Sequence, residues 1–397
     1  MEEWKEYTID DICKTIFAGG DAVKYNPTKN KTEENNIPIY ANSVDNEGLY
    51  GYCSKPLVTE PAVTVAARGA GTGFVCYRKY PYVPIVRLLT LIPNRNVDAH
   101  FLYYRLKKNF IKGDGSAIPQ LTVPMIKKEK ITLPSLVTQQ KIANILSSLD
   151  DKIEVNRRIN EQLEELAQAL FKSWFVDFEP FKDSEFVDSE LGMIPKGWKV
   201  GELSEIGDII GGATPSKSNE DYYTENGISW ITPKDLSINK NKFIDKGETD
   251  ITEIGYSKCS AKLMPRGSVL FSSRAHIGYI AIAKNELCTN QGFKSVVPKI
   301  AGTAFIYFYL KNNVSNIESM ASGSTFKEAS GTLMKSLKVI IPPSNLLQEY
   351  EEKISSIFKK QEYLEEEITH LTALRDTLLP KLMSGEMDVN ERGIERN

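Results

Sequence analysis

Two stretches of the chain carry apolar residues at the spacing of a long helix. In the first stretch the steps alternate between four and three residues, and the positions on them are Ile142, Leu146, Leu149, Ile153, Asn156, Asn160, Leu163, Ala167, Leu170 and Trp174. In the second stretch the stripe continues through Ile354, Ile357, Gln361, Leu364, Ile368, Leu371, Arg375, Leu378 and Leu382. This heptad pattern predicts two long helices whose apolar stripes pack on each other.

Polar residues on these stripes leave two interpretations open. Asn156, Asn160 and Gln361 either lie buried between the helices, where they would specify the register at some cost in stability, or face solvent.

Prolines mark the expected ends of both helices. Pro134 and the pair Pro342-Pro343 lie where a strand gives way to a helix, and Pro380 is expected to end or kink the second helix near residue 379. Each helix then has about 35–40 residues, or roughly 50–60 Å. Because that length exceeds what one compact domain needs, it predicts a spacer.

The chain also repeats itself. KITLPS (130–135) matches KVIIPP (338–343) after a displacement of 208 residues, and EWKEYTIDDI (3–12) matches GWKVGELSEI (197–206) after one of 194. The two displacements differ, so loops inside the two copies must differ in length. The order along the chain is therefore module, helix, module, helix.

The modules are expected to mix strands with short helices. The apolar runs that predict strands are IPIYA (37–41), AVTVAA (62–67), GFVCY (73–77), ISWIT (228–232), SVLFSS (268–273) and GYIAIA (278–283). Short helices are predicted at 101–109 and 304–313, which match between the copies.

We therefore predict an α+β protein with two mixed α/β modules, separated by two long antiparallel, coiled-coil-like helices, and a pseudo-twofold internal repeat. The predicted boundaries are 1–133 for the first module, 134–178 for the first spacer helix, 179–197 for a linker, 198–341 for the second module, 342–384 for the second spacer helix and 385–397 for a C-terminal tail.

Composition narrows the class. A chain of 397 residues calls for two or more domains, and 41% hydrophobic with 25% charged residues is typical of a globular protein. The sequence holds no 18-residue apolar run, its N-terminus does not resemble a signal peptide, and its five cysteines form no CxxC pair. We expect a reduced, cytoplasmic chain without a zinc site.

Charge is distributed unevenly. The net charge is −3, but residues 116–197 and 343–397, which hold the predicted helices, carry −3 and −5. The rest is mildly basic, which permits a local phosphate-binding surface.

The helical regions resemble a known family. The run IPQLTVPMIKKEKITLPSLVTQQKIANILSSLDDKIEVNRRINEQLEELAQALFKSWFVDFEPF (118–181), followed by LGMIPKGW, resembles the central conserved region of type I restriction–modification specificity subunits. GSTFKEASGTLMKSLKVIIPPSNLLQEYEEKI (323–354) and LRDTLLPKLMSGEM (374–387) resemble their distal conserved region. The resemblance is strong over 116–198 and 323–388 and weak inside the modules, which would be the target recognition domains.

This resemblance implies a non-catalytic, DNA-binding subunit of a prokaryotic defence system. Such subunits read a bipartite site in double-stranded DNA and recruit two methyltransferase (modification) subunits and then restriction subunits. S-adenosylmethionine, ATP and Mg would be used by those partners, so this chain is expected to bind no cofactor and no membrane. Two alternatives remain: an orphan bipartite DNA-binding protein, or a fragment of a fused modification–specificity enzyme.

The residues themselves show no catalytic motif. The sequence lacks the Asn/Asp-Pro-Pro-aromatic tetrapeptide of amino-methyltransferases and a GxxxxGK[ST] phosphate loop. Asp150-Asp151-Lys152 and Glu351-Glu352-Lys353 fall on the predicted helices and are interpreted as solvated surface, and the three histidines form no ligand pair. We expect no catalytic, cofactor-binding or metal site.

Several loops are candidates for DNA contact. RGAGTG (68–73) either exposes backbone N–H groups to phosphate or makes a tight turn, and SSRAHIG (272–278) places Arg274 where the first copy has Arg68. Asn290 and Gln291 could pair with adenine edges, whereas arginine favours guanine. The predicted DNA-binding residues are Lys24, Asn42, Arg68, Thr72, Arg78, Thr214, Ser216, Lys217, Lys234, Ser273, Arg274, His276, Asn290, Gln291, Ser324 and Lys327.

Large aromatic residues gather where the first helix should end. The set comprises Phe171, Trp174, Phe175, Phe178 and Phe181. They either pack against the next module or form a docking patch for a methyltransferase subunit. On the second alternative, these five residues are predicted to bind a partner subunit.

Overall fold

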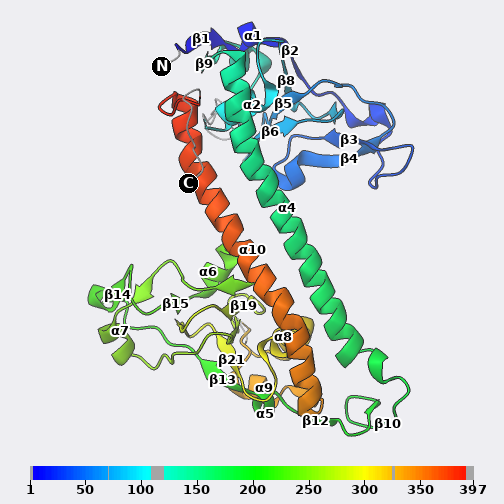
Figure 1. Cartoon of the computed structure of the whole chain (residues 1–397), viewed down its shortest axis with the longest axis vertical. Coiled ribbons are helices and arrows are strands. Elements are labelled where there is room, and N and C mark those ends of the chain that lie inside the picture. The colour runs from blue at the N-terminus through cyan, green and yellow to red at the C-terminus, as the bar shows by residue number, and fades with distance from the viewer. Residues whose placement is uncertain (1–2, 70, 109–119, 324–326, 390–397) are drawn as a thin grey trace, which may run out of the picture. The chain divides into compact units, whose positions relative to one another are not determined.

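The computed structural model describes residues 3–69, 71–108, 120–323 and 327–389. Contacts divide the chain into two units, Met1–Glu154 with Thr369–Asn397, and Val155–Ile368. Each unit combines one module with parts of the two long helices, α4 (Leu136–Phe175) and α10 (Ser344–Ser384) (Figure 1). This division cuts through both helices and does not test the predicted module boundaries, which stay a prediction.

The first unit holds the first module. Its helices are α1 (Ile9–Ile12), α2 (Ala99–Lys108) and α3 (Val123–Lys128). Its strands are β1 (Lys5–Thr8), β2 (Cys13–Ala18), β3 (Ile37–Tyr40), β4 (Leu49–Cys53), β5 (Ala62–Val65), β6 (Val75–Arg78), β7 (Val83–Pro84), β8 (Leu89–Pro93) and β9 (Lys130–Leu133). They form sheets in the orders β2-β8-β5-β6, β4-β3-β7 and β1-β9.

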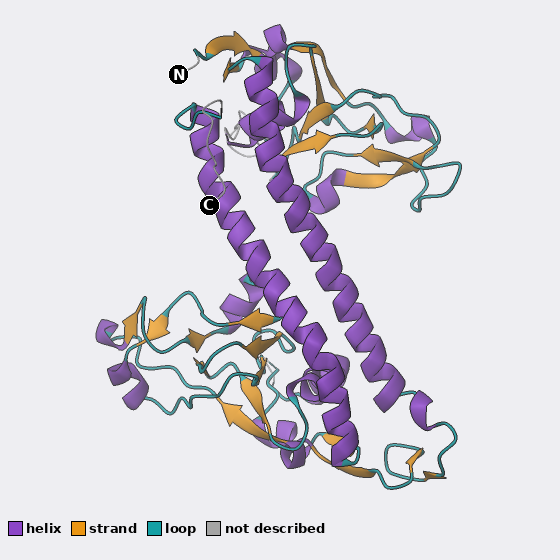
Figure 2. Ribbon diagram, in the orientation of Figure 1, coloured by secondary structure: helices purple, strands orange, loops and turns teal. Residues whose placement is uncertain are grey.

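The second unit holds the second module. Its helices are α5 (Leu203–Ile206), α6 (Pro233–Ile238), α7 (Glu253–Ser257), α8 (Thr303–Met320) and α9 (Gly331–Ser336). Its strands are β10 (Phe186–Val187), β11 (Ile194–Pro195), β12 (Lys199–Glu202), β13 (Gly207–Gly211), β14 (Tyr223–Thr224), β15 (Trp230–Ile231), β16 (Phe243–Ile244), β17 (Asp250–Ile251), β18 (Val269–Phe271), β19 (Ile280–Ala283), β20 (Cys288–Thr289), β21 (Lys294–Pro298) and β22 (Lys338–Ile341). The main sheet has the order β13-β21-β18-β19-β16, and Figure 2 shows how short its strands are beside the helices.

Strand register confirms the internal repeat. In the first module Lys5 of β1 pairs with Leu133 of β9, and in the second Lys199 of β12 pairs with Ile341 of β22. The paired positions are displaced by 194 and 208 residues, as in the sequence. The sheet order β2-β8-β5-β6 recurs as β13-β21-β18-β19, with β16 added at the edge.

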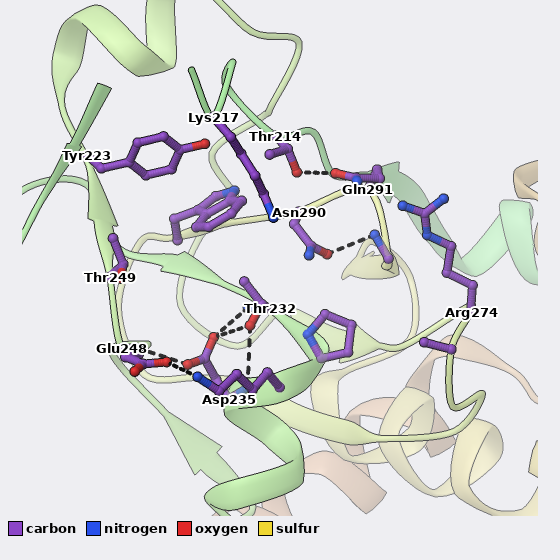
Figure 3. A pocket seen from close by; sticks show the side chains of 15 residues that line it. Thr214, Lys217, Tyr223, Thr232, Asp235, Glu248, Thr249, Arg274, Asn290 and Gln291 are labelled. Carbon is purple, nitrogen blue, oxygen red and sulfur yellow. Dashed lines mark hydrogen bonds and ion pairs between the residues drawn. The ribbon is translucent and has the colours of Figure 1, made fainter. Parts of the chain in front are cut away.

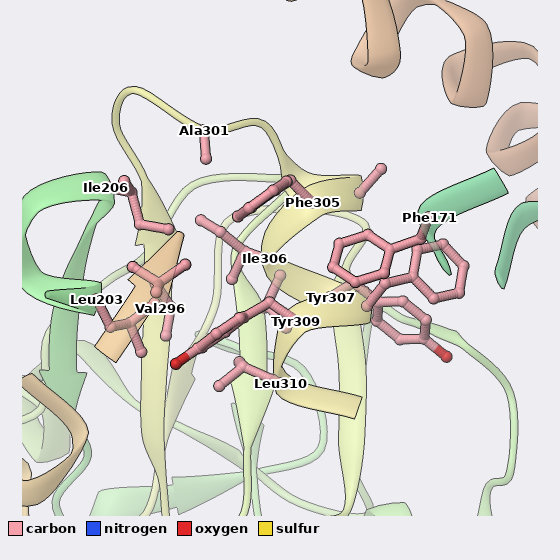
Figure 4. Packing of buried hydrophobic residues seen from close by; sticks show 14 of the residues in the cluster. Phe171, Leu203, Ile206, Val296, Ala301, Phe305, Ile306, Tyr307, Tyr309 and Leu310 are labelled. Carbon is pink, nitrogen blue, oxygen red and sulfur yellow. The ribbon is translucent and has the colours of Figure 1, made fainter. Parts of the chain in front are cut away.

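The long helices are joined to the modules by apolar cores. In the first unit Ile142 and Leu146 of α4 and Leu382 and Met383 of α10 are buried with residues of α2. In the second unit Phe171 of α4 packs on Phe305 of α8 with ring centroids 5.5 Å apart (Figure 4). The stripes predicted from heptad spacing therefore face module residues as well as each other.

Within each unit α4 and α10 also touch directly and run antiparallel. In the first unit Arg375 donates to Asp150 at 2.8 Å, and in the second Asn156 donates to Glu367 at 2.6 Å. The α+β class with two long, coiled-coil-like antiparallel helices is confirmed.

The question left open about the polar stripe residues now has an answer. Asn156 and Gln361 are almost completely buried. Gln361 donates to the carbonyl oxygen of Asn160 and to Glu164, both at 3.2 Å, and it accepts from Lys242 at 2.7 Å. Asn156 and Gln361 are therefore buried with hydrogen-bond partners rather than exposed, and Asn160 is half-buried.

Pro380 does not end the second long helix, which was one of the two effects expected of it. α10 runs through Pro380 and ends only at Ser384. Pro380 removes one backbone hydrogen bond from the last turns, but Leu382 and Met383 beyond it are buried in the core of the first unit. The burial of these two side chains stabilises the helical turn that the proline weakens.

Other predicted elements are confirmed with shifted limits. α8 extends to Met320 rather than 313, and ISWIT contributes only the two-residue strand β15. In the part of the chain that the structure describes, no helix is long and apolar enough to cross a membrane.

Candidate nucleic-acid interface

An open cleft of about 710 Å³ lies in the second module (Figure 3). Its walls come from the loop before β14, the start of α6, the turn after β18 and the turn after β20. The lining residues are Thr214, Lys217, Tyr223, Trp230, Thr232, Pro233, Lys234, Asp235, Glu248, Thr249, Arg274, Ala275, Asn290, Gln291 and Gly292. Residues far apart in sequence that were predicted to contact DNA thus meet in one place, namely Thr214, Lys217, Lys234, Arg274, Asn290 and Gln291.

The floor of the cleft is held by the start of α6. Thr232 and Asp235 form a capping box, in which Asp235 accepts from the backbone N–H of Thr232 at 2.7 Å and from its hydroxyl at 2.6 Å. The other carboxylate oxygen of Asp235 accepts the backbone N–H of Glu248 at 2.9 Å. Both oxygens of this buried carboxylate are therefore occupied.

Two glycines allow the backbone to close over Asn290. A Cβ at Gly212 would lie 2.0 Å from the carbonyl oxygen of Asn290, and one at Gly292 would lie 2.8 Å from Pro233. A side chain at either position would displace the turn after β20. The loop GGATPSKS (211–218) and the run TNQGF (289–293) therefore fit each other at these glycines.

The cleft leaves two cations without an acidic partner. Lys217 and Arg274 form no ion pair with any described residue, whereas Lys234 pairs with Glu248 at 2.5 Å, which raises the pKa of Lys234. In Figure 3 the Lys217 amine points toward Asn290, and Arg274 and Gln291 line the same cleft. A positive rim around hydrogen-bonding amides is suited to an anionic ligand with polar edges.

Aromatic residues in the wall were missed by sequence reasoning. Trp230 is buried and donates from its indole N–H to the carbonyl of Ala213 at 2.9 Å, and Tyr223 donates to the carbonyl of Pro215 at 2.7 Å. The tryptophan lay in a run interpreted only as a strand, and nothing local indicated that it would face the 211–218 loop.

The remaining predicted residues of the second module lie elsewhere. Ser273 is fully buried and donates to the carbonyl of Gly292 at 3.1 Å, so it supports the cleft without lining it. Ser216, His276 and Lys327 are exposed, and Ser216 bonds Ser218 at 2.8 Å. Ser324 lies outside the described residues.

In the first module Arg68 and Asn42 come together. Asn42 donates to the carbonyl of Arg68 at 3.0 Å, and Arg68 donates to Gln120 at 3.2 Å. Arg68 also forms an isolated bridge with Gln120, as Arg274 does with Glu328, and 120 and 328 are again 208 residues apart. The predicted equivalence of Arg68 and Arg274 therefore holds in the backbone pairing.

Three further residues of the first module differ in exposure. Lys24 is exposed, and Thr72 is buried with its hydroxyl donating to the carbonyl of Gly69 at 2.7 Å. Arg78 is buried, donates to the carbonyl of Glu47 at 2.6 Å and lies 3.6 Å from the centre of the Tyr40 ring. These contacts give Arg78 a structural role. The predicted contact of Arg78 with DNA stays a prediction, and the burial of the side chain does not favour it.

The aromatic set at the end of α4 forms part of the core of the second unit. Phe171 and Phe175 are buried, and Trp174, Phe178 and Phe181 pack against the same cluster. Phe178 and Phe181 lie 5.5 and 5.1 Å from the Trp198 ring. Packing against the following module explains their positions, and a role in partner docking stays a prediction.

The described residues contain no group of three or more His, Cys, Asp or Glu side chains arranged to hold a metal ion. Burial raises the pKa of Cys13 and of Cys288 to about 12, so these thiols are poor nucleophiles near neutral pH.

A duplicated α+β module attached to paired helices, with a cation-rimmed polar cleft in one copy, places the protein in the class of modular DNA-recognition proteins. The family model for the type I restriction modification DNA specificity domain matches residues 1–165 and 195–373. The chain belongs to this family, the specificity subunits of type I restriction–modification systems.

Relatives and a solved structure agree with this assignment. The Type I restriction enzyme HindI specificity subunit of Haemophilus influenzae is 27% identical, over 98% of this chain and 100% of the relative. The EcoR124I/EcoR124II specificity subunit of Escherichia coli is 30% identical over 82% of this chain and 77% of its own length. The crystal structure of the S subunit from M. genitalium has a TM-score of 0.70 at 18% identity, over 96% of each chain, which supports the fold.

Proposed function

We propose that this chain reads a bipartite sequence in double-stranded DNA, with one half-site for each module. The observation that carries the proposal is the duplication, because two modules with the same strand register are two copies of one reader. The cleft, whose Lys217 and Arg274 form no ion pair with any residue that the structure describes, supports a DNA-facing surface in the second copy. Cations of this kind contact phosphates, while amides contact base edges.

The proposal extends to partners. The chain holds two methyltransferase subunits and, through them, restriction subunits, and those partners use S-adenosylmethionine, ATP and Mg. This chain takes part by binding and positioning DNA. Consistent with that division of labour, its sequence lacks the tetrapeptide that holds a target amine and the phosphate loop of nucleotide-binding enzymes.

The test is a module exchange read out by methylation mapping. The chain is assembled with its modification subunits, and methylated adenines are located in DNA modified by the complex. Exchanging residues 198–341 for the same region of a relative should change one half-site and leave the other intact. Changes in both halves, or methylation that follows no two-part sequence, would contradict the proposal.

A matched control exchanges only 1–133. It should change the opposite half-site. The chain without its modification subunits should transfer no methyl group, and transfer by the pure chain would favour the fused-enzyme alternative.

A further inference from the structure

The hydrogen bonds inside the cleft decide which edge Asn290 presents. Its side-chain oxygen accepts the backbone N–H of Gly292 at 2.8 Å. A backbone N–H can only donate, so the amide orientation is set by the chain itself. The Asn290 Nδ2 group is left with no partner among the described residues and points into the cleft (Figure 3).

A second donor points toward the space that Asn290 faces, and the nearby acceptors already hold hydrogen bonds within the chain. The Lys217 ammonium points at the same space as the Asn290 amide (Figure 3). Gln291 is engaged by the Thr214 hydroxyl, and both oxygens of Asp235 are occupied. The Lys217 ammonium and the Asn290 amide N–H, which have no hydrogen-bond partner among the described residues, are therefore both donors that face this part of the cleft.

The four bases present different hydrogen-bond donors and acceptors to such a surface in the major groove. Adenine offers one acceptor beside an amino donor, cytosine offers an amino donor, and thymine offers one acceptor beside a methyl group. Guanine offers two acceptors, N7 and O6, and no donor. An amino group opposite Asn290 and Lys217 would place N–H against N–H, whereas guanine satisfies both.

We infer that Asn290 is a specificity-determining residue that reads a guanine in the half-site of the second module. The inference rests on the proposed function and deepens it. It also revises the expectation that Asn290 pairs with adenine, since the side-chain oxygen is turned toward the Gly292 N–H and the Nδ2 donor is the atom that points into the cleft.

The test uses base analogues in DNA bound by the chain assembled with its modification subunits. The half-sites are first selected from a randomised DNA library, and the half that changes on exchange of 198–341 is assigned to the second module. Each guanine of that half is then replaced by 7-deazaguanine, which lacks N7, or by 2-aminopurine, which lacks O6. At one guanine, an analogue should lower affinity about fivefold or more.

Asn290→Ala should lose a similar factor on natural DNA and become insensitive to the analogue at that guanine. Asn290→Asp keeps an oxygen for the Gly292 N–H and replaces the donor by an acceptor, so it should lose the guanine preference while the turn stays folded. Asn285→Ala, at an exposed position of the same module outside the cleft, should behave as the unmodified chain.

The inference is overturned if neither analogue matters at any guanine of that half-site. It is also overturned if Asn290→Ala stays as sensitive as the unmodified chain. Failure of the proposed function is a different result, since the library would then yield no two-part sequence at all.

Discussion

Arg274 is predicted to contact DNA, either at a phosphate or at a base edge. Its neighbour Ala275 has a φ of 66°, in the left-handed region that non-glycine residues rarely adopt, so the turn that presents the guanidinium is held in an uncommon conformation. Ser273 on the other side is anchored to the carbonyl of Gly292. The backbone thus projects Arg274 at the cleft rim, where phosphate contact is expected.

Replacing Arg274 by alanine should weaken binding to all DNA sequences alike. Loss of one phosphate contact reduces the slope of log affinity against log salt concentration by about one unit. Lys258→Ala, at the exposed position directly after α7 and outside the cleft, is the control. A loss confined to one base pair would show that Arg274 reads a base, and unchanged affinity would make the turn purely structural.

At the scale of elements, one buried ion cluster ties the second module to both long helices. Lys242, just before β16, pairs with Glu164 of α4 and donates to Gln361 of α10. Lys311 of α8 pairs with Glu164 as well. Burial lowers the pKa of Lys242 to about 8, although Glu164 opposes the shift.

Replacing Lys242 by methionine should destabilise the protein by about 3–5 kcal/mol, because Glu164 would stay buried with one cation fewer. Urea unfolding of the chain measures this, with Lys240→Met at an exposed position nearby as the matched control. The double change Lys242→Met with Glu164→Gln should recover part of the loss. A near-zero effect of Lys242→Met would show that the cluster contributes no net stability.

The same cluster predicts a pH dependence. Burial alone would raise the pKa of Glu164, but the ammonium groups of Lys242 and Lys311 outweigh it and hold the pKa below 4.5. Its contribution to stability is therefore present above pH 4.5 and lost as pH falls through the lower, folded-state pKa.

Glu164→Gln should flatten the acid side of the stability curve relative to the unmodified chain. Gln361 and the Tyr307 hydroxyl also face this carboxylate and do not titrate in that range. Stability measured at intervals from neutral to acid pH gives the comparison. Parallel curves for the two proteins would contradict the lowered pKa.

At the scale of the whole molecule, both long helices run through the division between the two units. Contacts within the units pair Asp150 with Arg375 and Asn156 with Glu367, and the division crosses α4 after Glu154 and α10 after Ile368. Seven residues inserted after each of these two positions would keep both apolar stripes in phase.

Such a double insertion should lengthen the gap between the half-sites and leave both half-sequences unchanged. One heptad adds about 10.5 Å, and DNA rises about 3.4 Å per base pair, so the gap should grow by up to about three base pairs. Methylation mapping of the assembled variant measures it. An insertion in α4 alone is the control and should abolish methylation, because the stripes would no longer match. A folded, active double variant with the original gap would show that the helices do not set the spacing.

The sequence by itself determined the elements that depend on local spacing. Heptad steps predicted α4 and α10, and the displacements of 208 and 194 predicted an internal repeat, which the equivalent strand pairs β1–β9 and β12–β22 display. Periodicity carries this information because it repeats over many residues. The sequence left open whether Pro380 would end or kink α10, and the helix continues past it to Leu382 and Met383, which are buried in the core of the first unit.

Only the tertiary structure decided how single polar side chains are used. Arg78 and Arg68 look alike in sequence, yet one lies buried against Tyr40 and the other lies exposed beside Gln120. The orientation of the Asn290 amide depends on the Gly292 N–H, and the environment of Lys242 depends on helices whose contacting residues are 78 and 119 positions away. Hydrogen bonds of this kind follow from the position of each partner in space, which residue spacing along one segment does not specify.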